Sequence, residues 1–182
     1  QRVTSEGRRY SATTRDGERL QVVVIDRDLE GAGLLSRAWR TLRLRDDDAY
    51  GGLSMRRTLE RAALMSYAAE AAGLPTPHLR AVREVGPDAS LLAYQHLEGQ
   101  TFGAIEVTDD DLRGAWQAVR RMHDEHIAHR ALSSEHLLRD PDGHVHLLDM
   151  GAGVVAMSDL QERIDLAELL ATSRSEEHTS EL

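Results

Sequence analysis

The chain has 182 residues, 41% of them hydrophobic and 29% charged, which is the composition of an ordinary globular segment. Its net charge is −9, and this acidic balance argues against a nucleic acid as partner, because such partners favour a basic surface. The absence of cysteine excludes disulfides and thiolate metal sites. No apolar run approaches the ~20 residues of a membrane-spanning helix, and the polar start at Gln1 does not resemble a signal peptide.

The first part of the chain predicts a β-hairpin followed by a helix. Residues 8–14 and 19–26 are β-prone runs, and Asp16-Gly17 between them is a strong hairpin signal. Residues 29–45 carry apolar side chains at helical spacing and a basic outer face. We expect this helix to serve packing, with contact to a membrane surface or a partner as the alternative.

A second helix and a second pair of strands follow. Ser54 is the expected N-cap of a helix over residues 55–72, which ends before Pro75. Two further strands are expected over residues 78–85 and 90–97.

The last part of the chain predicts another helix, a short hairpin and a final helix. Thr108 and Asp111 form a capping box at the start of a helix that runs to about His126. The elements expected after it are a strand at 137–138, a turn at 141–143, a strand at 145–148 and a helix that begins at Asp165.

Residues 129–151 contain the most specific motif of the sequence. The segment starts with His-Arg-Ala-Leu, passes through the short hairpin and ends with Asp149-Met150-Gly151. Protein kinases carry H-R-D-L-x-x-x-N, a hairpin and D-F-G in this order. Ala131 stands where the catalytic Asp of that pattern would be, and His136 stands where its metal-binding Asn would be. The spacing is therefore preserved while half of the chemical groups are absent.

Two other parts of a phosphate-binding apparatus are also missing. The strand that should carry a phosphate-binding Lys reads LQVVVID, with Val23 at the Lys position, and the chain contains no lysine. A loop that covers phosphates needs several glycines, and only Gly7 is near the first strand. Glu60, the acid nearest to the position that would pair with the Lys, is expected to be a surface charge.

These motifs resemble the protein-kinase and aminoglycoside-phosphotransferase-like superfamily over about residues 8–172. The resemblance implies an α+β, kinase-like bilobal fold, with a small antiparallel-sheet N-lobe with helices over residues 1–98 and a truncated, mostly helical C-lobe over residues 99–173. Residues 174–182, RSEEHTSEL, look like an in-frame translation of a common sequencing adapter and are expected to lie outside the natural protein.

The additional helix expected at 29–45 indicates a smaller group of proteins within this superfamily. The chain looks like the kinase-like cytoplasmic domain of actinobacterial membrane proteins that also carry a lysylphosphatidylglycerol-synthase or flippase-like transmembrane region. This resemblance implies a location at the cytoplasmic face of the plasma membrane, with the transmembrane region of the same full-length chain as partner.

The resemblance also suggests which residues form the site. The degenerate catalytic loop contains His129, Arg130, Ala131 and His136, and none of them is assigned a catalytic role. If a nucleotide binds, Glu98, Gly99, Asp149 and Gly151 are the expected contacts, with ATP and Mg²⁺ as cofactors and Asp149 as the metal ligand.

Two functions from different classes follow from these residues. The first is a pseudokinase-type regulatory or binding domain, since several roles of phosphoryl transfer are unfilled. The alternative is an active, atypical phosphotransferase that acts on a protein or a small molecule. A histidine metal site formed by His136, His144 and His146 across the hairpin is a further hypothesis, although no known ligand spacing matches it.

Overall fold

The computed structural model describes residues 3–4, 7–26, 55–85 and 89–177. The expected helix at 29–45, the N-cap at Ser54 and most of the turn after residue 85 lie outside these ranges. The described residues form an α+β fold with antiparallel sheets, as the sequence predicted. Two compact units make up the chain, one from Gln1–Ala63 with Leu79–His96, the other from Leu64–His78 with Leu97–Leu182.

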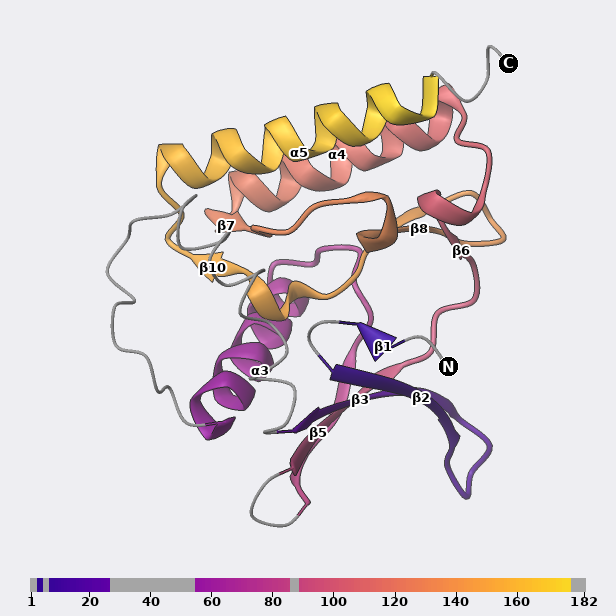
Figure 1. The fold of residues 1–182 in the computed structure, drawn as a ribbon, viewed down its shortest axis with the longest axis vertical. Coiled ribbons are helices and arrows are strands. Elements are labelled where there is room, and N and C mark those ends of the chain that lie inside the picture. The colour runs from indigo at the N-terminus through magenta and orange to yellow at the C-terminus, as the bar shows by residue number, and fades with distance from the viewer. Residues whose placement is uncertain (1–2, 5–6, 27–54, 86–88, 178–182) are drawn as a thin grey trace. The chain divides into compact units, whose positions relative to one another are not determined.

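The first unit is built on a five-stranded antiparallel sheet with the order β1-β2-β3-β5-β4 (Figure 1). The strands are β1 Val3–Thr4, β2 Gly7–Thr13, β3 Arg19–Asp26, β4 Leu79–Glu84 and β5 Ala89–Gln95. The hairpin between β2 and β3 turns at Gly17, whose φ of +86° is in the left-handed region that glycine tolerates. The predicted strands are therefore confirmed to within one or two residues at each end.

Helix α3, Met55–Ala71, contributes to both units. Its N-terminal part packs Leu59 and Ala62 with Leu79 and Leu92 of the sheet, and Val23 lies against this small apolar cluster. Val23 is thus a packing residue of the first unit. Glu60 is exposed, as expected of a surface charge, and makes an interaction with a neighbouring group.

The described part of the second unit contains the C-terminal part of α3, two further helices and two small sheets. Helices α4, Asp109–Asp124, and α5, Asp159–Glu177, lie side by side (Figure 1). The three-stranded sheet has the order β6-β8-β9, and β7 pairs with β10 in the other. The strands are β6 Gln100–Thr101, β7 Ile127–Ala128, β8 Leu137–Arg139, β9 Val145–Leu147 and β10 Val154–Val155. Three short 3-10 helices complete the described part of this unit: η1 Phe102–Ala104, η2 Ser134–His136 and η3 Met150–Ala152.

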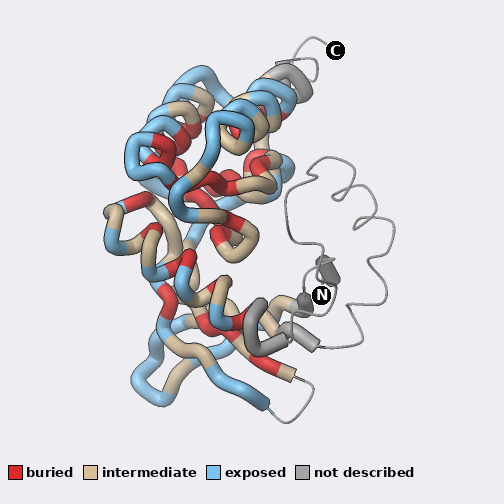
Figure 2. The backbone as a smooth tube through the Cα atoms, turned by 90° about the vertical axis from the view of Figure 1, so that its left-hand side faces the viewer, coloured by how far each residue is buried: buried red, intermediate tan, exposed pale blue. Residues whose placement is uncertain are grey.

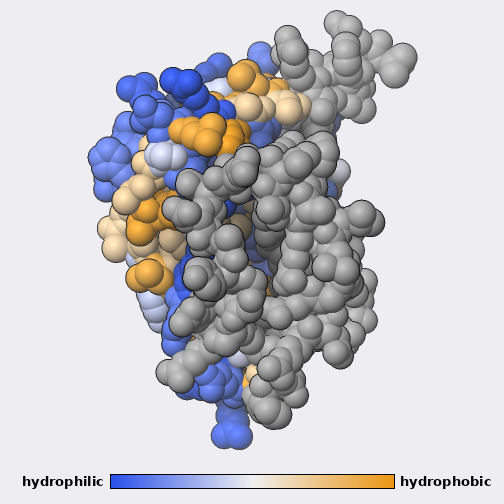
Figure 3. Space-filling view, turned by 60° about the vertical axis from the view of Figure 1, so that its left-hand side comes forward, coloured by the Kyte–Doolittle hydropathy of each residue, from blue (hydrophilic) through white to orange (hydrophobic). Residues whose placement is uncertain are grey.

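The core of the second unit joins the helices to the hairpin of β8 and β9. Its fully buried side chains include Phe102, Met122, Leu137, Leu147 and Leu169. Along α4 and α5, buried residues alternate with exposed ones, as Figure 2 shows. Large apolar side chains are also exposed on this unit, and Figure 3 shows hydrophobic patches among the hydrophilic groups on one face. Among the described residues, no helix is both long and apolar enough to cross a membrane.

The sequence predicted where α4 and α5 begin, and the structure agrees for α4 only. The capping box of α4 is present, since the Thr108 side chain accepts from the Asp111 backbone and the Asp111 side chain accepts from the Thr108 backbone. The start of α5 was predicted wrongly, because the helix begins at Asp159 and not at Asp165. Gln161 accepts a hydrogen bond from the backbone of Ser158 at 2.8 Å, which is half of a capping box that the sequence SDLQ already encodes.

The two units divide the chain differently from the proposed boundary at residue 98. The second unit includes Leu64–His78, which the sequence analysis placed with the N-terminal part. The reason is local packing, because Met65 and Ala69 of α3 and Leu74 belong to the core of the second unit. The backbone of Leu147 also donates to the carbonyl oxygen of Pro75 at 2.7 Å. The assignment of the units as kinase-like lobes remains a prediction.

Candidate functional site

The motif residues 129–151 form one connected structure in the second unit. The chain leaves β7 at Ala128, makes a loop to η2, passes through the hairpin of β8 and β9 and ends at Asp149. Arg130 and Asp149 have φ angles of 67° and 61°, in the left-handed region that side chains other than glycine rarely adopt. Such a residue costs on the order of 1–3 kcal/mol and persists only where its surroundings hold it.

Two acids of α5 hold the loop after β7. One carboxylate oxygen of Asp165 accepts from the backbone N–H of His129 and the other from that of Arg130, both at 2.7 Å. Glu168 lies one turn later and accepts from the backbone N–H of Leu132 at 2.8 Å. Three backbone donors of the loop thus end on one helix, and we call these three hydrogen bonds the α5 clamp. The clamp accounts for the unusual backbone of Arg130.

Asp165 is itself fully buried and has a third partner. The ring nitrogen Nε2 of His123 on α4 lies 3.2 Å from Asp165 Oδ2, and His123 is also buried. A buried carboxylate is tolerated only when hydrogen bonds replace its water. Asp165 therefore links α4, α5 and the loop through contacts that strand and helix patterns do not reveal.

His129 connects the loop to the strand that precedes Asp149. Its Nε2–H donates to the carbonyl oxygen of Leu148 at 2.7 Å, and the ring is completely buried. Burial lowers the pKa of His129 below the ordinary value of 6.5, and the nearby His136 lowers it further. The hydrogen bond to Leu148 and the carboxylates of Asp165 and Asp149 raise the pKa, but they do not outweigh the burial. Within the described residues, its buried Nδ1 has no hydrogen-bond partner. A proton there would be an unsatisfied buried donor, so His129 is a neutral, structural residue.

His136 and Asp149 meet at the other end of the motif. The Nε2 atom of His136 lies 3.7 Å from Asp149 Oδ2, and its Nδ1 lies 2.8 Å from the hydroxyl oxygen of Ser133. The rings of His129 and His136 are neighbours, with centroids 5.4 Å apart. The side chains of His136 and Asp149 are 23% and 21% exposed, so solvent reaches this end of the motif, whereas His129 and Asp165 at the other end are fully buried.

Two further residues of the motif, Ala131 and Gly151, contribute to the path of its backbone and carry no charged group. Ala131 is half-buried and places a methyl group where the kinase pattern has its catalytic carboxylate. Gly151 lies within η3, which brings the chain from Asp149 toward β10. The tight position is Gly153, where a Cβ would lie 2.8 Å from the carbonyl oxygen of Ala128 and 2.9 Å from that of Met150. The sequence analysis did not select Gly153, because this close approach is a tertiary contact.

Glu98 and Gly99 are exposed residues between β5 and β6. Gly99 has a φ of +146°, and a Cβ there would lie 2.3 Å from the carbonyl oxygen of Arg139. Only glycine fits this position. Gly99 is thus required by its packing against β8, and the expectation that it contacts a nucleotide remains a prediction.

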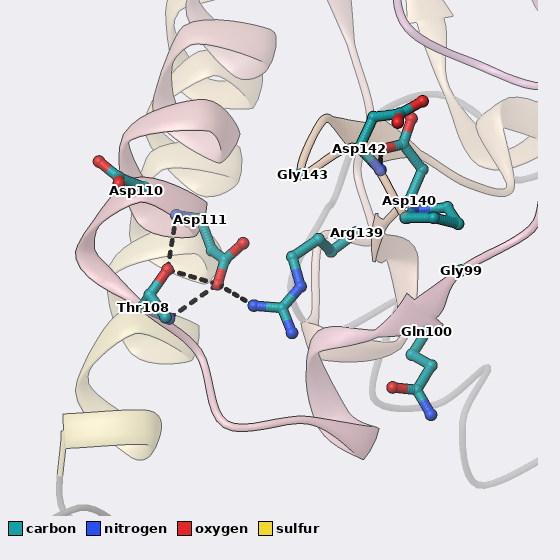
Figure 4. A pocket seen from close by; sticks show the side chains of 10 residues that line it. Gly99, Gln100, Thr108, Asp110, Asp111, Arg139, Asp140, Asp142 and Gly143 are labelled. Atoms are coloured by element: carbon teal, nitrogen blue, oxygen red, sulfur yellow. Dashed lines mark hydrogen bonds and ion pairs between the residues drawn. The ribbon is translucent and has the colours of Figure 1, made fainter.

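A polar cavity of about 590 Å³ opens beside Gly99 in the second unit (Figure 4). In its wall the guanidinium of Arg139 donates to Asp111 at 2.8 Å, and Figure 4 shows the two side chains pointing toward one another. The full lining is Gly99, Gln100, Thr108, Asp110, Asp111, Arg139, Asp140, Pro141, Asp142 and Gly143. Because Asp111 also caps α4, the acids on this side of the cavity have structural partners.

The predicted histidine metal site is not assembled. His136 lies with Asp149, while His146 and His144 contact Asp140 at 2.9 and 3.5 Å. Burial would raise the pKa of Asp140, but hydrogen bonds from His146 and from the backbone N–H groups of His144 and Asp142 outweigh it and lower that pKa. Ligand atoms of Asp140, Asp142 and His144 lie within 4.8 Å of one another at the surface. Exposed groups of this kind are common without an ion.

The residues around Asp149 do not fit a magnesium ion. Mg²⁺ prefers six oxygen ligands in a near-octahedral arrangement. Among the described residues, His136 places an imidazole beside Asp149, and Ala131 supplies no oxygen from its side chain. One carboxylate and one ring nitrogen are a poor set of ligands for this ion, so no step that depends on Mg²⁺ follows from the site.

The comparisons with known proteins add no assignment. No protein-family model matches the chain, and the curated proteins contain no significant match.

Proposed function

We propose that the chain is a degenerate kinase-like regulatory or binding domain. The observation that carries this proposal is the contrast within residues 129–151. The α5 clamp, the bond from His129 to Leu148 and the left-handed backbone of Asp149 define the loop, while Ala131 and His136 replace two groups that phosphoryl transfer needs. Val23, which packs in an apolar cluster, replaces a third. Two compact units, one with an antiparallel sheet and one with paired helices, are what a kinase-like bilobal fold would require.

A thermal-shift titration with ATP tests the binding function. We expect any rise in the melting temperature to be the same with and without Mg²⁺, because the described contact of Asp149 is a ring nitrogen of His136 and not one of the oxygen ligands that this ion prefers. The matched variant is Asp149→Ala, with Asp124→Ala as control, since Asp124 is an exposed acid of the same unit and is not part of the cavity lining. A shift that requires Mg²⁺ and disappears in Asp149→Ala alone would contradict the degenerate site.

The narrower resemblance leads to a second part of the proposal. We infer that the domain is the cytoplasmic part of a larger integral membrane protein of the lysylphosphatidylglycerol-synthase or flippase-like type, with the membrane region of the same chain as its partner. Sequencing of the genomic locus from residue 173 onward tests this inference. Several apolar spans of ~20 residues are expected downstream. A reading frame that continues without any such span would remove this part of the proposal.

A further inference from the structure

Ser133, His136 and Asp149 form a line of a hydroxyl, an imidazole and a carboxylate. Ser133 Oγ and His136 Nδ1 lie 2.8 Å apart, within hydrogen-bond distance, and the tautomer of the ring sets which of the two atoms donates. The other ring nitrogen, Nε2, faces Asp149 Oδ2 at 3.7 Å, and with the ring proton on Nε2 the Nδ1 atom accepts from the Ser133 hydroxyl. The three residues come from the two ends of η2 and from the segment after β9.

This order of groups is the arrangement that activates a serine. A serine hydroxyl is a weak nucleophile until a neighbouring base accepts its proton. A carboxylate on the other side of the base orients the ring and stabilises the imidazolium that forms. The separation of 3.7 Å between His136 and Asp149 is longer than a hydrogen bond, and such contacts are often looser before a substrate binds.

The turn that carries Ser133 and His136 is held in place by its backbone. The N–H of His136 donates to the carbonyl oxygen of Ser133 at 2.9 Å, and the N–H of Leu148 donates to that of His136 at 2.8 Å. The second bond fixes η2 against the strand that leads to Asp149. All three side chains are partly exposed, so a reagent in solution can reach them.

A local turn explains the contact between Ser133 and His136 but not the position of Asp149. A serine that merely closes a turn needs no acid behind its histidine. Asp149 itself has a left-handed backbone conformation, which its surroundings maintain at a cost. The acid faces the nitrogen opposite to the serine, which is where a base needs support.

We propose that Ser133 is a nucleophile that accepts an acyl group from an activated ester, with His136 as its base and Asp149 as a positioning residue. In this step Ser133 Oγ forms a bond to the carbonyl carbon and the bond from that carbon to the alcohol oxygen breaks. The hydroxyl proton passes to His136 Nδ1 and then to the departing alkoxide. The step uses no nucleotide and no metal, so a test of it is independent of the kinase-like function.

A fluorophosphonate probe tests the proposal, because it reacts with activated serines. The Ser133 oxygen replaces fluoride at phosphorus, and the released proton leaves with the fluoride ion. Mass spectrometry of the digested 182-residue chain is expected to find the label on Ser133. His136→Asn should slow the labelling by about 10²–10⁴-fold, the usual contribution of a general base. Asp149→Asn should slow it less, and the matched control Ser134→Ala should leave the rate unchanged.

Two results would overturn the proposal. One is labelling of Ser133 no faster in the native chain than in the same chain unfolded in urea. The other is an unchanged rate in a folded His136→Asn variant, with folding checked by circular dichroism. Should that variant fail to fold, the comparison of native and unfolded wild-type chains still decides the question.

Discussion

Replacement of Asp165 by alanine is expected to lower the free energy of unfolding by on the order of 3–5 kcal/mol, the loss typical of a buried charged group removed from its partners. The substitution leaves the backbone N–H groups of His129 and Arg130 and the Nε2–H of His123 without their acceptor inside the protein. Urea denaturation followed by circular dichroism measures this loss. Because whole domains are stable by only about 5–15 kcal/mol, the variant should unfold at a markedly lower urea concentration.

The variant Asp165→Asn distinguishes the loss of hydrogen-bond acceptors from the loss of side-chain volume. An asparagine has the same shape but only one oxygen, so its amide would place a donor against one of the loop's donors. Its stability is expected to be close to that of Asp165→Ala. Asp159→Ala is the matched control, since Asp159 is an exposed acid on the same helix. Equal stability of Asp165→Asn and the wild type would show that the α5 clamp does not hold the loop.

Replacement of His129 by phenylalanine is expected to remove a pH dependence of stability. The folded-state pKa of His129 lies below the unfolded value of 6.5, so below that pH the unfolded chain binds a proton that the folded chain does not. The free energy of unfolding therefore falls as the pH drops through 6.5, by up to about 1.4 kcal/mol per pH unit, and this contribution is fully present above it. His129→Phe should be less stable at every pH, because the carbonyl of Leu148 loses its donor, but its stability should change less with pH.

Denaturation series between about pH 7.5 and pH 5.5 compare the two proteins over the relevant range. His144→Gln is the control, since His144 is an exposed histidine whose side chain is 75% accessible. The control should follow the wild type. If His129→Phe and the wild type lose stability in parallel as the pH falls, then His129 is not the neutral buried group described above.

Much of the fold could be predicted because its signals are local. The hairpin at Asp16-Gly17, the helix that starts at Met55 and the capping box of Thr108 depend on residues that are neighbours in the chain. The same holds for β8 and β9, where Pro141 and Gly143 mark the turn. The start of the helix at Asp159 also has a local signal, the half capping box of Ser158 and Gln161.

The central features of the site could not be predicted in this way. Asp165 was identified only as the start of a helix, because nothing in its neighbouring residues shows that it accepts bonds from a loop that precedes it by more than thirty positions. The contact of His136 with Asp149 likewise depends on how η2 and the turn after β9 place the two side chains, which the strand pattern does not show. One sequence signal existed for the clamp, since Asp165 is one helical turn from Leu169 on the inner face of α5, and an acid on such a face must have a buried partner.

The measurement that most directly tests the central claim is transfer of the γ-phosphate of ATP by the 182-residue chain, with the wild type and Asp149→Ala compared in the presence of Mg²⁺. Loss of a general base alone typically costs 10²–10⁴-fold in rate, and here the phosphate-binding Lys and a metal ligand are replaced as well. The account predicts the same background rate for both proteins. Phosphate transfer by the wild type that Asp149→Ala abolishes would contradict it and would establish an active, atypical phosphotransferase.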